Sequence, residues 1–300
     1  MAAIGSDLRE IRPISTHRAD RGQSVVGKIL WLASYPRSGN TWLRAFLHNL
    51  FRNSDEPHDI NRLQDFTLID GDARWYRMLD PRPPTELTKE EVAALRPRAH
   101  AAMTAAFPDT VIVKTHSALV EDRGTPMITL KHTAGAIYVI RNPLDVAVSY
   151  SSHYGISLDE AVAAMNRPGN QSVGNQENFV YELHGSWSEH VKSWTATLNP
   201  ALHVVRYEDM ANEPQRAFAG VAGFLGLQVA PERLAQAIER SSFAILREQE
   251  LRKGFRERSR KSHTFFHSGK VGRGTQLLAP SLAESLCLNH REQMARFGYA

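Results

Sequence analysis

The sequence has little of several features that mark specialised classes of protein. Among its 300 residues there is one cysteine, Cys287, which excludes an internal disulfide and indicates a reducing compartment. Its most apolar stretches, Ile29–Ala33 and Val221–Leu227, fall far short of the roughly 20 residues that a membrane span needs. The N-terminal region also has no apolar core of a secretory signal. We therefore expect a cytoplasmic protein with no membrane span.

The net charge of the chain is also small. Lys and Arg number 36 and Asp and Glu number 32, which leaves a net charge of +4. So small an excess hints at an anionic partner but does not indicate nucleic acid, and the basic run 252–261 carries no nucleic-acid motif. The share of hydrophobic residues, 42%, and of charged residues, 23%, excludes collagen, coiled-coil and wholly disordered chains.

Short β-branched or apolar runs alternate with stretches of helical spacing, and this alternation predicts an α/β fold with a central parallel sheet flanked by helices. The runs that predict strands are 28–34, 110–114, 136–140 and 202–206. Helices are predicted from Thr41 onward, from Asn142-Pro143 onward, and over 213–227 and 231–246. Residues 52–109 are predicted to hold helices and loops, and 167–178 and 252–275 to be mobile loops.

The domain organisation follows from the same patterns. Residues 1–27 are polar and without periodicity, so we expect a flexible N-terminal leader. From residue 28 to residue 300 there is neither an internal repeat nor a linker between folding units, and a single domain is expected.

The segment Ser34–Trp42, SYPRSGNTW, is the strongest chemical signal. A buried strand ends there, a turn of small residues follows, and a helix begins, which gives a P-loop-like strand–loop–helix unit. A helix N-terminus offers unpaired N–H groups and a positive dipole end. Gly39 allows close backbone approach, while Arg37 adds a planar cation. The pattern indicates a cradle for phosphate or sulfate, and the alternative is an ordinary strand-to-helix turn.

This segment resembles the TYPKSGTTW loop of the sulfotransferases that use 3′-phosphoadenosine 5′-phosphosulfate (PAPS). It lacks the pattern of a Walker A loop, because it has one glycine and no Lys before the Thr. The resemblance covers about residues 28–300, through motifs that follow in the family's order, and it is to a cytosolic-type, bacterial-like member. It implies that the 5′-phosphosulfate end is bound by a run of loop and helix residues: Arg37, Ser38, Gly39, Asn40, Thr41 and Trp42.

The segment Val113–Ser117, VKTHS, resembles the family's strand-end K-T-H. The resemblance implies that His116 is the general base and that Lys114 and Arg37 assist the transferring group. The chemistry agrees, because an imidazole can take the proton of an acceptor hydroxyl at neutral pH. A strand-end histidine that serves only as a structural hydrogen-bonding group is the alternative.

Three further segments resemble parts of the nucleotide site. YVIRNPLDVAVSY implies that Arg141 and Ser149 bind the 3′-phosphate, although a helix-start ion pair with Asp145 is an alternative for Arg141. RYEDM implies a nucleotide contact by Tyr207, and SSF implies Ser241 and Phe243 near the adenine.

The last segment departs from the family. Where the family has F-x-R-K-G-x-x-G-x-W, this chain has FFHSGKVGRG over 265–274. His267 and Ser268 stand at the basic pair and Gly274 at the Trp, so charge would come from Lys270 or Arg273 at shifted positions. We expect Ser268, Gly269 and Lys270 to contact the cofactor.

The resemblance implies in-line transfer of a sulfuryl group from PAPS to a hydroxyl, phenolic ones included, or to an amine of a small-molecule acceptor. The other product is 3′,5′-bisphosphoadenosine, and no metal is needed. Two other functions stay open: a small-molecule kinase on the same cradle, and a catalytically silent nucleotide or anion sensor. A nucleic-acid binder ranks third. The acceptor and the oligomeric state do not follow from the sequence.

Overall fold

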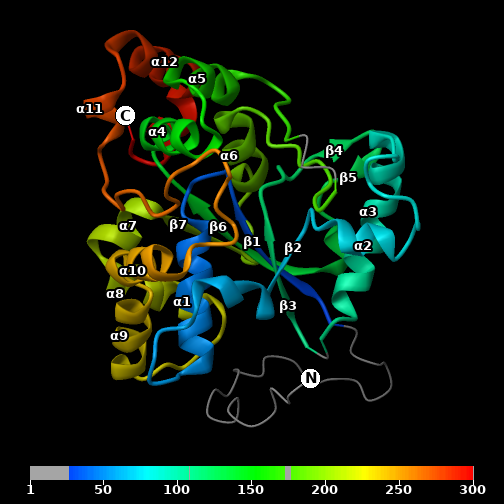
Figure 1. Cartoon of the computed structure of the whole chain (residues 1–300), viewed down its shortest axis with the longest axis horizontal. Helices are drawn as coiled ribbons and strands as arrows, with labels where there is room; N and C mark the ends of the chain where they lie inside the picture. The colour runs from blue at the N-terminus through cyan, green and yellow to red at the C-terminus, as the bar shows by residue number, and fades with distance from the viewer. Residues whose placement is uncertain (1–26, 108, 173–176, 300) are drawn as a thin grey trace.

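The computed structural model describes residues 27–107, 109–172 and 177–299, so all but the last residue of the expected leader lies outside the described residues. Its centre is a five-stranded parallel sheet in the order β2-β3-β1-β6-β7 (Figure 1). The strands of this sheet are β1 (Ile29–Ser34), β2 (Thr67–Ile69), β3 (Val111–Thr115), β6 (Thr133–Ile140) and β7 (Leu202–Arg206). A separate antiparallel pair joins β4 (Glu121–Asp122) and β5 (Thr125–Pro126). The expected central parallel sheet is confirmed.

Helices flank this sheet, as expected, and the first of them begins one residue before Thr41, where the sequence predicted it to begin. The helices are α1 (Asn40–Arg52), α2 (Ala73–Arg77), α3 (Lys89–Thr104), α4 (Pro143–Tyr154), α5 (Leu158–Asn166), α6 (Trp187–Thr195), α7 (Tyr207–Asn212), α8 (Pro214–Phe224), α9 (Pro231–Arg240), α10 (Phe243–Lys253), α11 (Gly274–Leu277) and α12 (Pro280–Arg296), with short 3₁₀ turns η2 (Ile60–Asp65) and η3 (Leu130–His132). The predicted cap of α4 is present, since the Asn142 side chain accepts a hydrogen bond from the Leu144 N–H at 2.9 Å. No helix in the described ranges is long and apolar enough to cross a membrane.

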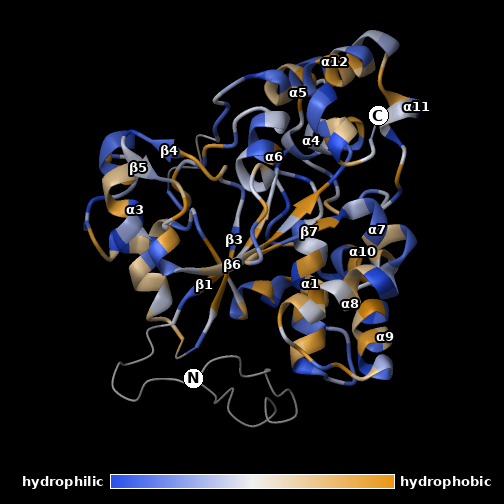
Figure 2. Cartoon of the chain, turned by 180° about the vertical axis from the view of Figure 1, so that it is seen from behind, coloured by the Kyte–Doolittle hydropathy of each residue, from blue (hydrophilic) through white to orange (hydrophobic). Residues whose placement is uncertain are grey.

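Two hydrophobic cores lie on the two faces of the sheet, and alternation along the strands separates them. In β1, Trp31 and Ala33 belong to the core under α3, α4, α6 and α12, whereas Leu30 and Leu32 face α1, α8 and α9. The strands of the sheet carry mainly hydrophobic colours in Figure 2, and α9 shows both colours. Because both faces of β1 are buried, its sequence is a continuous apolar run rather than an alternating one.

Two details of the predicted elements are wrong. The helix expected over 231–246 is divided into α9 and α10, because the Ser241 hydroxyl donates back to the Ala237 carbonyl at 2.8 Å and Ser242 adopts an extended backbone. The segment 52–109 contains the edge strand β2, whose three residues are too few to give a periodic signal. The segment 252–275 is largely without helix or strand, although α10 extends into its start and α11 begins at its end.

The parallel register brings three strand ends to one edge of the sheet. Ala33 of β1 pairs with Thr115 of β3, and Ser34 pairs with Val139 of β6. The residues that follow these strands therefore emerge together, where open α/β sheets bind their ligands. This edge carries the predicted motifs.

We predict that Phe46→Ala lowers the free energy of unfolding by about 3–5 kcal/mol, as measured by urea denaturation. Phe46 is fully buried and stacks on Phe218 at 4.1 Å between ring centroids, so its loss leaves a cavity between α1 and α8. Leu198→Ala is the control, because Leu198 is fully exposed, and it should change the value by less than about 0.5 kcal/mol. Equal losses in the two variants would contradict the assigned core.

Candidate active site

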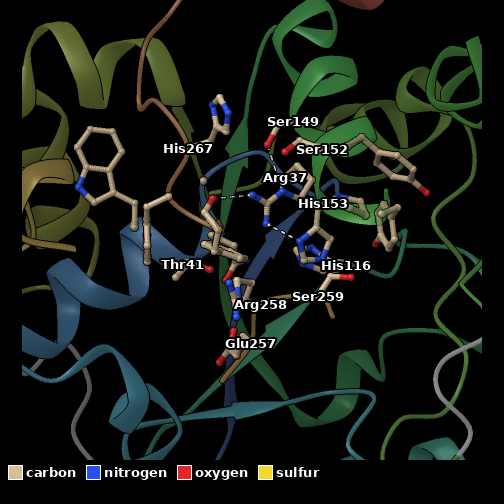
Figure 3. A pocket seen from close by; sticks show the side chains of 18 of the residues that line it. Arg37, Thr41, His116, Ser149, Ser152, His153, Glu257, Arg258, Ser259 and His267 are labelled. Carbon is tan, nitrogen blue, oxygen red and sulfur yellow. Dashed lines mark hydrogen bonds between the residues drawn. The ribbon is translucent and has the colours of Figure 1, made fainter. Parts of the chain in front are cut away.

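A cavity of about 1490 Å³ opens at the carboxyl edge of the sheet. Its walls come from segments that are far apart in the sequence: the β1–α1 loop, the end of β3, α4, residues 177–182, and residues 256–273. Figure 3 shows Arg37, His116 and His153 together inside it. The sequence motifs for the two ends of a nucleotide thus meet in one space.

The β1–α1 loop has the geometry of an anion cradle. Gly39 adopts φ 109°, and a Cβ there would lie 2.7 Å from the Tyr207 ring, so only glycine lets this loop pack against Tyr207. In the first turn of α1, the Trp42 and Leu43 N–H groups donate to the Gly39 carbonyl at 3.0 and 3.2 Å, whereas the opening N–H groups of a helix have no carbonyl partner in the preceding turn. Ser38 is 1% exposed, and its hydroxyl has no hydrogen-bond partner among the described residues.

The next three residues of the motif all line the cavity, and one of them also has a structural role. The Asn40 amide donates to the Leu32 carbonyl at 2.8 Å, which ties the start of α1 to β1. Asn40, Thr41 and Trp42 all line the cavity, and Trp42 packs edge-on to Tyr207 with centroids 5.5 Å apart. Asn40 therefore shapes the loop besides lining the cavity.

The Arg37 side chain is held by three neutral oxygen or nitrogen atoms. Its Nε donates to the Ser149 hydroxyl at 3.1 Å, one terminal nitrogen lies 3.3 Å from His153 Nδ1, and the other donates to the Phe265 carbonyl at 3.3 Å. Its guanidinium also lies 4.1 Å from the centroid of the Phe265 ring. Burial and the nearby Arg141 lower the pKa of Arg37 to about 10, which leaves it cationic at neutral pH. Ser149, predicted to bind phosphate, contacts Arg37 here.

Arg141 lies between Tyr207 and the loop that carries Arg37. It stacks on the Tyr207 ring at 4.0 Å and donates to the Arg37 carbonyl at 3.2 Å. The ion pair with Asp145 that the sequence left open is present but long, at 3.9 Å. Arg141 Nε is buried without a partner among the described residues, so the side chain keeps hydrogen-bonding capacity.

His116 follows β3, and its ring nitrogens have different roles. Nδ1 donates to the Ser34 carbonyl at 2.8 Å, because a carbonyl oxygen can only accept. This tautomer leaves Nε2 with a free lone pair. Burial, together with the charge of Lys114, lowers the pKa of His116 well below its usual range, so the imidazole is neutral at pH 7.

Two charged side chains accompany His116 in the cavity lining. The Lys114 ammonium has no hydrogen bond or ion pair with any residue that the structure describes. Glu182 accepts a hydrogen bond from the His116 backbone N–H at 3.0 Å. Burial would raise the pKa of Glu182, but nearby His184 and Lys114 lower it below its usual range, so it is ionised.

The segment 265–274, which departs from the family motif, is anchored to α4 by Asp145. The Asp145 carboxylate accepts from the N–H groups of Gly272 at 2.8 Å and Gly274 at 2.6 Å. Ser268 and Gly269 line the cavity, and a Cβ on Gly269 would meet the Phe243 ring at 2.4 Å.

The two cations of this segment differ in position. Lys270 is exposed and outside the cavity lining, although its carbonyl accepts from Arg141 at 3.5 Å. Arg273 lines the cavity and contacts His267 Nδ1 at 3.0 Å. Of the two shifted cations that the sequence offered, Arg273 is thus the one that faces the site.

The SSF segment is also divided. Phe243 begins α10 and lines the cavity. Ser241 is fully buried and ends α9 with hydrogen bonds to the Ala237 and Ile238 carbonyls. Its hydroxyl is therefore committed to the helix end.

Sequence reasoning did not find three of the residues in or beside the cavity. His153 lies four residues after Ser149 on α4, and this helical spacing could have indicated a shared face. Glu182 carries no local motif. Glu257 lines the cavity and forms a bidentate ion pair with the fully buried Arg44 of α1, at 2.8 and 2.9 Å. Contacts that join positions 213 residues apart leave no spacing signal.

The comparisons with known proteins agree with the motifs. A sulfotransferase-domain family model matches residues 28–298, which confirms the resemblance. The chain is 27% identical over 71% of its length to sulfotransferase 1A1 of Bos taurus, covering 64% of that protein. It is 25% identical over 79% of its length to sulfotransferase 1B1 of Mus musculus, covering 71% of it. The chain thus matches less than two thirds of the bovine relative.

Solved structures share the fold at low identity. The structure of retinol dehydratase with androsterone and inactive cofactor PAP superposes with a TM-score of 0.62 at 19% identity, over 89% of this chain and 80% of that one. Mouse sulfotransferase SULT7A1 with PAP gives 0.58 at 18% identity, over 89% and 84%.

We predict that Gly39→Ala destabilises the chain by about 1–3 kcal/mol more than Gly124→Ala, in urea denaturation. Both glycines have positive φ, so both variants carry the backbone penalty, but a Cβ at Gly124 meets nothing within 4 Å. The difference isolates the contact with Tyr207. A Gly39→Ala variant no less stable than Gly124→Ala would show that the loop does not pack closely on that ring.

Proposed function

Because the chain belongs to the sulfotransferase family, we propose that it transfers a sulfuryl group from PAPS to a hydroxyl or amine of a small-molecule acceptor. The observation that carries the proposal is the placement of His116. Its Nε2 is a free base in the same cavity as the Lys114 ammonium and the Arg141 guanidinium, whose Nε has no partner among the described residues. Phenolic hydroxyls are included in the acceptor class.

The residues present suit a nucleotide with a phosphosulfate and a second phosphate. The buried Ser38 hydroxyl is a donor without a partner among the described residues, and it lies next to Arg37 in the loop that leads into α1. Arg141 has a buried Nε without a partner and suits the 3′-phosphate. Trp42 and Phe243 offer aromatic surface for a base. When bound, PAPS would supply the activated sulfuryl group.

His116 would take the acceptor proton at Nε2 as the acceptor oxygen or nitrogen attacks. The bond from Nδ1 to the Ser34 carbonyl keeps the ring oriented through this step. The ionised Glu182 carboxylate, which accepts a hydrogen bond from the backbone N–H of His116, favours the imidazolium that forms. The proton thus comes to lie on a ring where the Glu182 carboxylate offsets part of the repulsion from Lys114.

Lys114 and Arg37 would stabilise the negative charge that develops on the sulfuryl oxygens and the leaving phosphate. Such fixed charges act without reorganisation, and a well-placed donor lowers the activation barrier by several kcal/mol. Catalysis would then be mostly positioning and electrostatics, as in phosphoryl transfer. No residue of the chain needs to be modified covalently.

We predict that isothermal titration calorimetry gives micromolar or tighter binding of 3′,5′-bisphosphoadenosine, and much weaker binding of ATP and adenosine 5′-phosphosulfate. Arg141→Ala should remove this selectivity, because its guanidinium is the group offered to the 3′-phosphate. Tight selective binding with no transfer across a broad acceptor panel would favour a silent sensor. Turnover of ATP with Mg²⁺ and none of PAPS would favour a kinase.

We predict that His116→Ala lowers kcat by about 10²–10⁴-fold while bisphosphoadenosine affinity is largely kept. Since the base must be neutral and burial lowers its pKa, the acid limb of the kcat/KM profile for PAPS should lie below pH 6.5. Activity therefore stays level as pH falls through the usual imidazole range. Loss of binding together with turnover, or an acid limb at or above pH 6.5, would count against His116 as the base.

A further inference from the structure

Arg37 needs support from outside its own loop. Its backbone adopts φ 68°, a left-handed conformation that few non-glycine residues take, and its side chain extends into a cavity. Within the described residues, no carboxylate lies within 4.0 Å of the guanidinium, and its hydrogen-bond partners are Ser149, His153 and Phe265. All three partners are uncharged acceptors.

A second arginine in the same region shows the opposite arrangement. Arg44 is fully buried and is held by both oxygens of the Glu257 carboxylate. That arginine is neutralised by its partner and joins α1 to the segment after α10. Arg37, by contrast, is held in place by uncharged groups and has no ion pair within 4.0 Å among the described residues, so its charge stays available to an anion in the cavity.

His153 is the partner that can change its protonation state. Because the Arg37 nitrogen can only donate, Nδ1 of His153 must be unprotonated, and the ring proton lies on Nε2. Burial, then the charges of Arg37 and Lys114, lower the pKa of His153 to about 3. Lys114 acts on both His116 and His153, so both rings lie near the same ammonium. Figure 3 shows the contact between Arg37 and His153.

We infer that His153 is a positioning residue for the transfer reaction: its unprotonated Nδ1 orients the Arg37 guanidinium in the cavity without neutralising its charge. Ser149 and His153 lie one turn apart on α4 and hold two different nitrogens of the guanidinium, Nε and a terminal one. Two bonds from one rigid helix fix both the position and the plane of the group. The inference rests on the proposed function, in which Arg37 faces the transferring group.

The variants separate orientation from folding. His153→Phe keeps a ring but has no acceptor, and it should lower kcat about 10–100-fold, the effect of a small misplacement. Affinity for 3′,5′-bisphosphoadenosine should fall less than about fivefold, the worth of one hydrogen bond. His153→Asn places an amide oxygen near the position of Nδ1 and should restore most of kcat. His132→Phe, on η3 and outside the cavity lining, should match the wild type.

A double-mutant cycle tests whether His153 acts through Arg37. In an Arg37→Lys background, where the planar fork is gone, His153→Phe should have little further effect on kcat. The same fold-loss in both backgrounds would overturn the inference, as would unchanged kcat in His153→Phe alone.

A readout without turnover keeps the inference separate from the proposed function. In ¹⁵N NMR of the imidazoles, His153 should show an unprotonated Nδ1 at neutral pH, and Arg37→Lys should shift that resonance. An insensitive resonance would refute the contact whether or not the chain transfers sulfuryl groups. Absence of transfer from the wild type with a shifted resonance would instead reject the proposed function and keep the pairing.

Discussion

The parallel pairing of β1 with β3 and β6, with the register that it has at the strand ends, is the constraint on which the site depends. It places Ser34, His116 and Arg141 at the ends of three adjacent strands, although they come from positions 34 to 141 of the chain. The hydrogen bond from His116 to the Ser34 carbonyl is a direct product of this register, since it crosses from the end of β3 to the end of β1. A slip of one residue between these strands would exchange the faces of every side chain and remove that bond.

The electrostatics of the cavity follow from how each cation is supported. Arg44 has a carboxylate partner, Glu257, and joins α1 to the segment after α10. Its charge is therefore neutralised within the protein. Arg37 and Lys114 have neutral partners or none among the described residues, and Arg141 keeps an uncommitted buried nitrogen. A buried positive charge without a partner is costly, and that cost falls when an anion enters. The site is therefore organised for a polyanionic ligand, and the neutral His116 fits there because a protonated imidazole would add to the repulsion.

The sequence predicted the parts of this molecule that depend on local patterns. The strands 28–34, 110–114, 136–140 and 202–206 were found because buried parallel strands are continuous apolar runs, and α4 was found by its Asn-Pro start. Local patterns did not reveal β2, because it pairs with β3, a strand more than 40 residues later in the chain. They also did not reveal the break at Ser241, where the side-chain hydroxyl donates to the Ala237 carbonyl at the end of α9. The roles of His153 and Glu182 depend on contacts 116 and 66 residues away, with Arg37 and with His116. Their positions in the site could be known only after the fold had brought those segments together.

The segment 265–274 shows how a motif can change its residues while its backbone stays anchored. Gly274 stands where the family has Trp, and a Cβ at this position would lie 2.3 Å from the Leu144 backbone, so α4 and this segment touch directly. The same contact allows the Asp145 carboxylate to accept from two backbone N–H groups of the segment. Because the anchor is backbone, the side chains at 267 and 268 are free to differ from the basic pair. Arg273, one residue before the anchored Gly274, is thereby held at the wall of the cavity that Arg141 also lines.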